Sequence, residues 1–283
     1  MEETSKKLFS IGDDSNEIKR RLASFNTEAL WDIMLHLQYD ISHGTEISYL
    51  NEDFDWKNSE SVLEIGFGSN YPIGSMKNTF PKKTFEQITL DIDYSKRQKW
   101  DYKPLTNFIK DQLKLKGKKS YDYIFLRLVA QHVAQPGVLV NLFVPYMKKS
   151  TRLLLFDACD RMHLTKPELV PITKMYQSLK RLQDAGGGNR MATEKLHRRV
   201  GALGFKSLKS KYPICQSDTQ EMKELFYNIY LLHAEVINRF MNGKIDIDLI
   251  LRELSRWILF PESIGQFGFH FLLLGGKPRK ISG

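Results

Sequence analysis

The sequence predicts an α/β protein with a mainly parallel sheet. Short apolar runs alternate with segments of helical periodicity, which is typical of right-handed βαβ units. These runs lie at 61–65, 87–90, 121–126 and 152–156. The first run leads into Gly66-Phe67-Gly68, and the second ends at Asp91. In an open parallel sheet a ligand binds beyond the carboxyl ends of the strands, where glycines admit it and a carboxylate can accept ribose hydroxyls. We therefore expect a nucleotide-type site at this edge.

Length and composition are those of a soluble globular protein. The 283 residues are 42% hydrophobic and 27% charged, with room for one elaborated domain and a large core. Cys159 and Cys215 are the only cysteines and form no zinc-like spacing, so we expect two small buried side chains, no disulfide framework and no metal site. The first seven residues carry no apolar leader and no stretch is suited to span a membrane, so we expect a cytoplasmic protein.

The formal net charge of +9 raises the question of a nucleic-acid partner. Part of the excess lies between Lys96 and Lys119, where lysines alternate with apolar residues at helical spacing. That pattern is typical of the exposed face of a helix that covers a sheet. No nucleic-acid-binding motif accompanies it, so a nucleic-acid partner stays an alternative and is not favoured.

Helices are predicted on both sides of the core. One begins at Asn26 or Thr27, either of which can be its N-cap, and ends before Tyr39, after a polar and loosely held stretch at 1–24. Helices are also predicted within the core at 104–115, at 137–148, from Asp160 to Gln183 and at 193–203. Two more are predicted between the last two strands, at 218–240 and 247–259. The predicted division is an N-terminal helical segment or lid (1–58), a core (59–216 and 265–283) and a helical insertion that caps the substrate (217–264).

Aromatic residues of these flanking helices are candidates to line a pocket for an apolar or planar molecule. They are Trp31 and Tyr39 in the N-terminal segment and Phe226, Tyr227, Tyr230, Phe240 and Trp257 in the insertion. The alternative is that the helices pack on one another or on a second subunit. The sequence does not indicate the oligomeric state.

The order of these motifs resembles the class I S-adenosylmethionine-dependent methyltransferases over roughly residues 60–212 and 267–274. Glu64-Ile65-Gly66-Phe67-Gly68-Ser69-Asn70 resembles the first motif of that family, Glu/Asp-x-Gly-x-Gly-x-Gly, with Asn70 at the third glycine. Asparagine tolerates left-handed backbone, so the turn can survive. Gly186-Gly187-Gly188-Asn189-Arg190 and Gly204-Phe205 are similar to the small-molecule branch. The resemblance implies a Rossmann-like seven-stranded sheet whose last strand is antiparallel.

The same resemblance implies an S-adenosylmethionine site. Asp91 would hold the ribose, with Asp93 as its substitute, and Trp100-Asp101-Tyr102 would face the adenine, although Asp101 taken alone is more typical of a surface loop than of an adenine contact. The segment 127–132 would flank the methionine part. The implied cofactor-binding residues are Glu64, Gly66, Phe67, Gly68, Asn70, Asp91, Ile92, Asp101, Tyr102, Arg127, Leu128 and His132.

These features favour an enzyme that transfers a methyl group to oxygen or nitrogen of a small-molecule acceptor. Such a displacement needs alignment and a dry pocket, and a base only where the acceptor must lose a proton. His132 is the candidate base, with Asp160 behind it; a helix-packing role and a turn role are their alternatives. His163, His197 and His270 have no partner motif, and we expect them to be structural.

Two other functions are compatible with the sequence. One is a protein or RNA methyltransferase, although Arg127-Leu128-Val129-Ala130 replaces the Asn-Pro-Pro-Tyr-type motif of base methylation. The other is a non-catalytic scaffold with a methyltransferase fold, which Asn70 alone supports. Salt-sensitive affinity for RNA would favour the protein or RNA methyltransferase. Failure to bind the cofactor would favour the scaffold.

Overall fold

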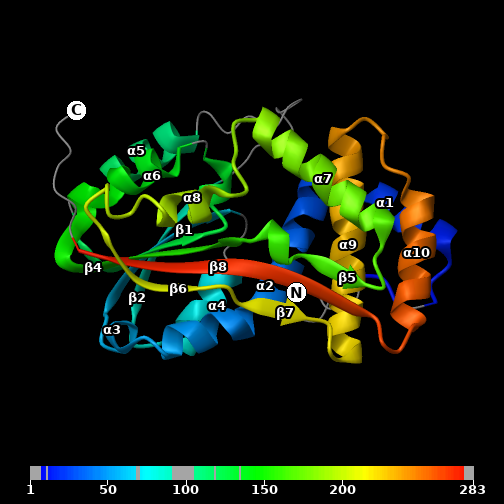
Figure 1. The fold of residues 1–283 in the computed structure, drawn as a ribbon, viewed down its shortest axis with the longest axis horizontal. Coiled ribbons are helices and arrows are strands. Elements are labelled where there is room, and N and C mark those ends of the chain that lie inside the picture. The colour runs from blue at the N-terminus through cyan, green and yellow to red at the C-terminus, as the bar shows by residue number, and fades with distance from the viewer. Residues whose placement is uncertain are drawn as a thin grey trace.

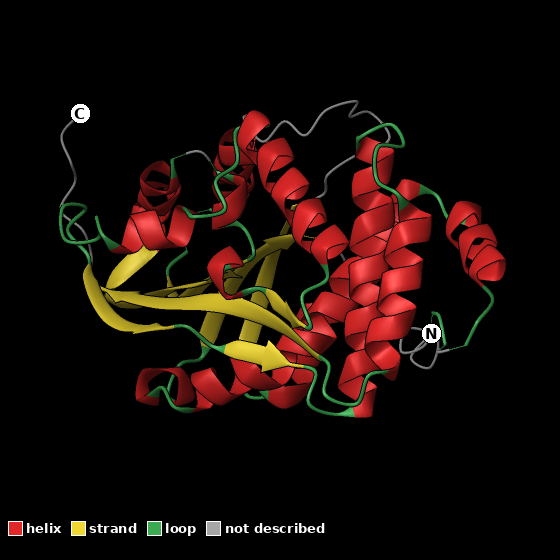
Figure 2. Cartoon of the chain, turned by 45° about the vertical axis from the view of Figure 1, so that its right-hand side comes forward, coloured by secondary structure: helices red, strands yellow, loops and turns green. Residues whose placement is uncertain are grey.

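A central sheet with helices on both faces forms one part of the molecule, and a group of long helices packs against one end of it (Figures 1 and 2). The computed structural model describes residues 8–10, 12–67, 71–90, 105–117, 119–133 and 135–276. The strands are β1 (Ser61–Phe67), β2 (Thr84–Leu90), β3 (Tyr121–Arg127), β4 (Met147–Ala158), β5 (Leu164–Lys166), β6 (Lys206–Lys211), β7 (Ile214–Gln216) and β8 (Ile264–Gly275).

The sheet confirms the predicted mainly parallel arrangement with an antiparallel last strand. Strands β2, β1, β3 and β4 lie side by side in this order and run parallel, and β8 pairs antiparallel with β4. Within the described residues the sheet has eight strands instead of seven. The reason is that β8 begins at Ile264, earlier than expected, and this extra length pairs with the three-residue strands β5 and β7.

Each face of the sheet has its own hydrophobic core, because successive side chains of a strand point to opposite faces. Leu63, Ile124 and Leu153 pack with α5 (Leu105–Leu115), α6 (Pro136–Phe143) and α8 (Ala192–His197). Their neighbours on the same strands, such as Val62 and Tyr123, pack on the other face. That second core continues into the long helices and is the larger of the two.

The long helices at the end of the sheet come from three separate parts of the chain. They are α1 (Ser15–Ser24), α2 (Thr27–Asn51), α7 (Val170–Ala185), α9 (Gln220–Phe240) and α10 (Ile247–Leu259). Figure 1 shows α7, α9 and α10 beside the N-terminal half of β8, and α2 behind the sheet. The short helices α3 (Phe54–Lys57) and α4 (Tyr71–Thr79) lie below the sheet in that view. None of the described helices combines the length and apolar character needed to cross a membrane.

The N-terminal region differs from the prediction in two ways. Helix α2 does not end before Tyr39 but continues to Asn51, since Ile41, Glu46 and Leu50 are buried against the rest of the fold and packing extends the helix. The stretch before it is also ordered where it is described. Its helix α1 begins at the N-cap Asp14, and two of its apolar side chains are buried.

The segment after β4 was predicted to be helical from Asp160 onward, and this is wrong. The chain first makes a single 3-10 turn at Asp160–Met162 and then strand β5, so helix α7 begins only at Val170. The helices predicted at 137–148 and 193–203 are shorter, at Pro136–Phe143 and Ala192–His197. Both cysteines are buried and free, as expected.

Candidate functional site

A buried group of two glutamates and one arginine lies at the carboxyl edge of β1 and β3. We call Glu46, Glu64 and Arg127 the acid–arginine cluster. Strand β1 supplies Glu64 and β3 supplies Arg127, while α2 brings Glu46 across the edge. Arg127 Nη2 donates to Glu46 Oε1 at 2.7 Å, and Arg127 Nε lies 3.2 Å from Glu64 Oε1. All three side chains are at most 7% exposed.

The cluster contains two carboxyl groups and only one guanidinium. Burial raises the pKa of Glu46 to about 7, against the opposing effect of Arg127, and burial also raises the pKa of Glu64. Among the described residues, Glu46 Oε2 and Arg127 Nη1 have no hydrogen-bond partner. Leaving such groups buried and unsatisfied is costly. The cluster therefore has spare donor and acceptor capacity for a ligand.

The backbone directly after Arg127 is strained. Leu128 has φ of 54°, a left-handed conformation that a branched side chain rarely adopts, and its N–H donates to Phe156 O at 2.7 Å. Such strain persists only where surrounding structure imposes it, and it concentrates at functional sites. Here it turns the chain out of β3 so that the next residues, up to His132, border a cavity.

A second group of charged and polar side chains lies beyond the end of β4. Arg190 Nε lies 2.7 and 2.6 Å from the two oxygens of Asp160, and Arg190 Nη1 donates to Gln183 Oε1 at 2.9 Å. We call Asp160, Gln183 and Arg190 the clamp. Burial raises the pKa of Asp160, but the Arg190 guanidinium outweighs it and holds that pKa below its ordinary value. The charges of the clamp balance.

A cavity, which we call cavity A, lies between the clamp and the segment that follows Arg127. It has a volume of about 50 Å³ and is enclosed by α2, α7, α9 and the segment after β3. Its polar lining includes Gln131, His132, His163, Tyr176, Gln183, Arg190 and His233. Trp31 and Leu128 contribute to its apolar lining. Helix α9 reaches it from the predicted insertion, whose role as a substrate cap stays a prediction.

The histidines around cavity A are uncharged at neutral pH. Burial lowers the pKa of His132 and of His233 to about 3, with a further effect of Arg190 on both, and lowers the pKa of His163 to about 4. The Gln183 amide lies 3.4 Å from His132 Nδ1. Within the described chain neither ring nitrogen of His163 makes a hydrogen bond. Apart from the Arg190 guanidinium, which Asp160 and Gln183 engage, the described residues that line the cavity are uncharged.

The structure brings together five of the predicted site residues. Glu64, Gly66, Arg127, Leu128 and His132 lie at the carboxyl edge of β1 and β3 or directly after it. Asp160 lies across cavity A from this group, beside Arg190. Only the backbone of Phe67 is described. Outside the described residues are Gly68, Asn70, Asp91, Ile92, Asp93, Trp100, Asp101 and Tyr102.

Sequence reasoning missed several residues that border this region. Glu46 was missed because its helix was expected to end before Tyr39. His163 was expected to be structural, yet it lines the cavity, and the hydrogen-bonded pair Tyr176 and His233 was not considered. Of the aromatic candidates, Trp31 lines cavity A. Phe226, Tyr227 and Trp257 are buried in the core instead.

Comparison with known proteins gives similarity of structure at low sequence identity. No family model matches the chain. No curated protein matches it in sequence either. Among solved structures, the plantazolicin methyltransferase BpumL in complex with S-adenosylhomocysteine aligns at 15% identity and a TM-score of 0.42, covering 93% of this chain and 91% of its own.

Two further solved structures show what the similarity does not decide. Coclaurine N-methyltransferase, bound to N-methylheliamine and S-adenosylhomocysteine, aligns at 11% identity and a TM-score of 0.41 over 82% of this chain and 71% of its own. The [4+2]-cyclase SpnF aligns at 12% identity and a TM-score of 0.40 over 78% and 76%. Since TM-scores this low go with both a transferase and a cyclase, the reaction must be argued from this chain's residues.

Proposed function

We propose that this protein is an S-adenosylmethionine-dependent methyltransferase that acts on oxygen or nitrogen of a small molecule. The acid–arginine cluster carries the proposal. It lies at the carboxyl edge of β1, where Glu64 precedes the Gly66-Phe67-Gly68 sequence by two residues. S-adenosylmethionine ends in a carboxylate and an ammonium on one carbon, and the spare groups of the cluster match both. Arg127 Nη1 would donate to the carboxylate, and Glu46 Oε2 would accept from the ammonium.

The charge of the cluster supports the same ligand. Two buried carboxylates facing one guanidinium leave an excess of negative charge when both are ionised, which is expensive in a low-dielectric interior. A ligand with an ammonium and a sulfonium supplies the missing positive charge. The remaining contacts rest on the resemblance: the turn ending at Asn70 for the methionine part, Asp91 and Ile92 for the ribose, and Asp101 with Tyr102 for the adenine.

Cavity A is the proposed place of the reacting group of the acceptor. When bound, the cofactor supplies an activated methyl group. The chain's task is then to align the acceptor and exclude water, which together can lower a barrier by about 7–11 kcal/mol. A histidine with a pKa of about 3 is a weak base, and Asp160 is engaged by Arg190. We therefore propose that His132 hydrogen-bonds the acceptor and that Asp160 positions its surroundings, so that neither acts as a strong base.

Calorimetric titration with S-adenosylmethionine and S-adenosylhomocysteine tests the cofactor assignment. Wild type should bind both, and Asp91→Ala should weaken binding by at least about tenfold, since hydrogen bonds to a charged group contribute about 1.5–3 kcal/mol. Asp111→Ala is the matched control, because that carboxylate is exposed and, among the described residues, pairs with Lys114 alone. Absence of binding by the wild type would overturn the proposal and favour a scaffold.

A further inference from the structure

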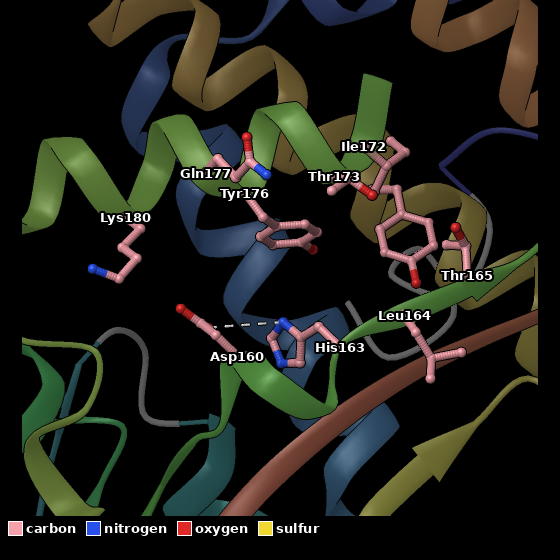
Figure 3. A pocket seen from close by; sticks show the side chains of 10 residues that line it. Asp160, His163, Leu164, Thr165, Ile172, Thr173, Tyr176, Gln177 and Lys180 are labelled. Atoms are coloured by element: carbon pink, nitrogen blue, oxygen red, sulfur yellow. Dashed lines mark ion pairs between the residues drawn. The ribbon is translucent and has the colours of Figure 1, made fainter. Parts of the chain in front are cut away.

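A second cavity adjoins cavity A and shares two of its lining residues. This cavity, which we call cavity B, has a volume of about 180 Å³ and lies between α7 and the segment that includes β5 (Figure 3). His163 and Tyr176 line both cavities. Their rings meet edge to face with centroids 5.5 Å apart, so these two side chains form the partition between the cavities.

The chemistry of cavity B is that of a site for an uncharged ring. Aromatic and aliphatic side chains, among them Ile172, Tyr176 and Tyr230, form most of its lining. The hydroxyls around it are already engaged: Tyr176 pairs with His233 at 3.1 Å, Thr165 accepts from a backbone N–H, and Thr173 donates to Glu168. Among the described lining residues, the hydrogen-bonding groups left for an occupant are those of the exposed Gln177 amide and the His163 ring, so apolar contact must supply most of its affinity.

The charges at cavity B are likewise already paired. Asp160 is held by Arg190, and Lys180 at the far end of the lining forms an ion pair of 2.7 Å with Asp184. Figure 3 shows Lys180 one turn along α7 from Tyr176, with Asp160 and His163 below them. A charged ligand would gain no free counter-ion here and would lose its hydration. The site therefore selects neutral molecules.

The different volumes of cavities A and B suit ligand groups of different size. A dry apolar cavity of about 150 Å³ is enough to hold a benzene ring, so cavity B has room for one ring. Cavity A, at about 50 Å³, has room only for a group of a few atoms. Within the described chain Gln131 Oε1 has no hydrogen-bond partner, and neither ring nitrogen of His163 has one, although His163 Nδ1 lies 3.9 Å from Asp160 Oδ1 on the side of cavity B. A small polar substituent suits cavity A better than a second ring.

We propose that cavity B is a binding subsite for an uncharged aromatic ring of the acceptor, from which a small polar group reaches past His163 and Tyr176 into cavity A. The inference rests on the proposed function, because cavity A is where the methyl group would be received. It assigns the acceptor class as neutral, one-ring molecules with a short polar arm. Tyr176 and His163 then determine specificity, since they separate the ring from the reacting group.

Toluene and benzyl alcohol are suitable probes, because they share the ring and differ in the polar arm. Calorimetric titrations, with and without S-adenosylhomocysteine, should show that wild type binds both and prefers benzyl alcohol by at least threefold. Thr173→Trp, which fills cavity B, should weaken both by at least tenfold. Val170→Trp is the matched control: it adds the same side chain to an exposed position of α7 that does not line the cavity.

A third variant tests the reach into cavity A. His163→Phe keeps a ring in the partition but removes both nitrogens, so the preference for benzyl alcohol should fall to about unity while toluene still binds. Equal binding by the two tryptophan variants, no probe binding by wild type, or a preference that survives in His163→Phe would each overturn the inference. The titration with S-adenosylhomocysteine alone separates this failure from failure of the proposed function, because cavity B is not needed for cofactor binding.

Discussion

Arg127 and Arg190 are both buried and both contact carboxylates, but the charge around them differs. Arg190 faces one carboxylate through two oxygens and completes its contacts at Gln183, so the clamp is balanced. Arg127 lies between two carboxylates, and spare polar atoms remain on both sides. The comparison distinguishes a group that holds the fold together from one that is incomplete without a ligand. Four variants test this distinction, beginning with the largest expected effect.

Removal of the balanced arginine should cost the most stability. Arg190→Met leaves the Asp160 carboxylate, which is about a quarter exposed, without its partner, and breaking a buried pair costs about 3–5 kcal/mol in unfolding free energy. Unfolding by denaturant measures this loss of free energy. The matched control is Lys180→Met, whose partner Asp184 is half exposed and whose loss should cost about 0–1 kcal/mol. Equal losses in the two variants would show that the clamp is not a structural element.

Removal of the arginine in the cluster should cost less stability, although the side chains of Arg127 and Arg190 are both only 7% exposed. In Arg127→Met the two glutamates can take up protons, because burial already raises their pKa values, so we expect a loss of about 1–2 kcal/mol at pH 6. The same unfolding experiment checks it, with Arg252→Met, an exposed arginine, as the reference. A loss as large as that of Arg190→Met would contradict the contrast between the two groups.

The pH dependence of cofactor binding should depend on Glu46. Its pKa of about 7 in the free protein means that it is mostly protonated at pH 6 and mostly ionised at pH 8. A ligand ammonium favours the ionised form, so affinity should rise about tenfold between these pH values. Glu46→Gln should abolish the rise, and Glu28→Gln, an exposed change on the same helix, should keep it. If the pH dependence of cofactor affinity is the same in both variants, Glu46 does not contact the cofactor.

The same group should affect the stability of the empty protein in the opposite direction. Because the pKa of Glu46 is higher in the folded than in the unfolded chain, its contribution to stability is complete below pH 4.5 and is lost as pH rises through 7. Between pH 6 and 8 this amounts to about 1 kcal/mol of unfolding free energy. The loss should be absent in Glu46→Gln.

The smallest expected effect concerns the partition next to the clamp. Tyr176→Phe removes the 3.1 Å hydrogen bond to His233 and should lower the unfolding free energy by about 1 kcal/mol. It should leave binding of S-adenosylhomocysteine unchanged, since Tyr176 lies away from the acid–arginine cluster. Tyr49→Phe, at a ring packed on Phe271, is the control. Weakened cofactor binding in Tyr176→Phe would show that the two regions are coupled.

Much of the fold could be predicted from the sequence because its signals are local. The apolar runs of β1 and β3, the N-cap Asn26 and the amphipathic helix α5 depend on neighbouring residues and appear where expected. The continuation of α2 beyond Tyr39 could not be predicted. Its final turns bury Glu46, a residue that only becomes favourable inside the fold once Arg127 is beside it.

The candidate site likewise contains residues that could be predicted from local motifs and residues that could not. Glu64 and Arg127 follow from motifs at strand ends, where the topology fixes their place. His163 and Tyr176 come from a turn and a helix that the chain brings together only through β5 and its pairing with β8. No periodicity or spacing connects these two residues in the sequence. A partition between two cavities is therefore visible only in the folded protein.

The most direct test of the central claim is a comparison of two ligands that differ only in the group the cluster should bind. S-adenosylhomocysteine carries the aminocarboxyl end, and 5′-methylthioadenosine lacks it. By calorimetry, wild type should bind S-adenosylhomocysteine at least about a hundredfold more tightly, as two charge-assisted contacts predict, and Arg127→Met, which removes one of the two contacts, should lower this ratio to about tenfold. If Arg127→Met keeps the wild-type ratio, the acid–arginine cluster does not bind the cofactor.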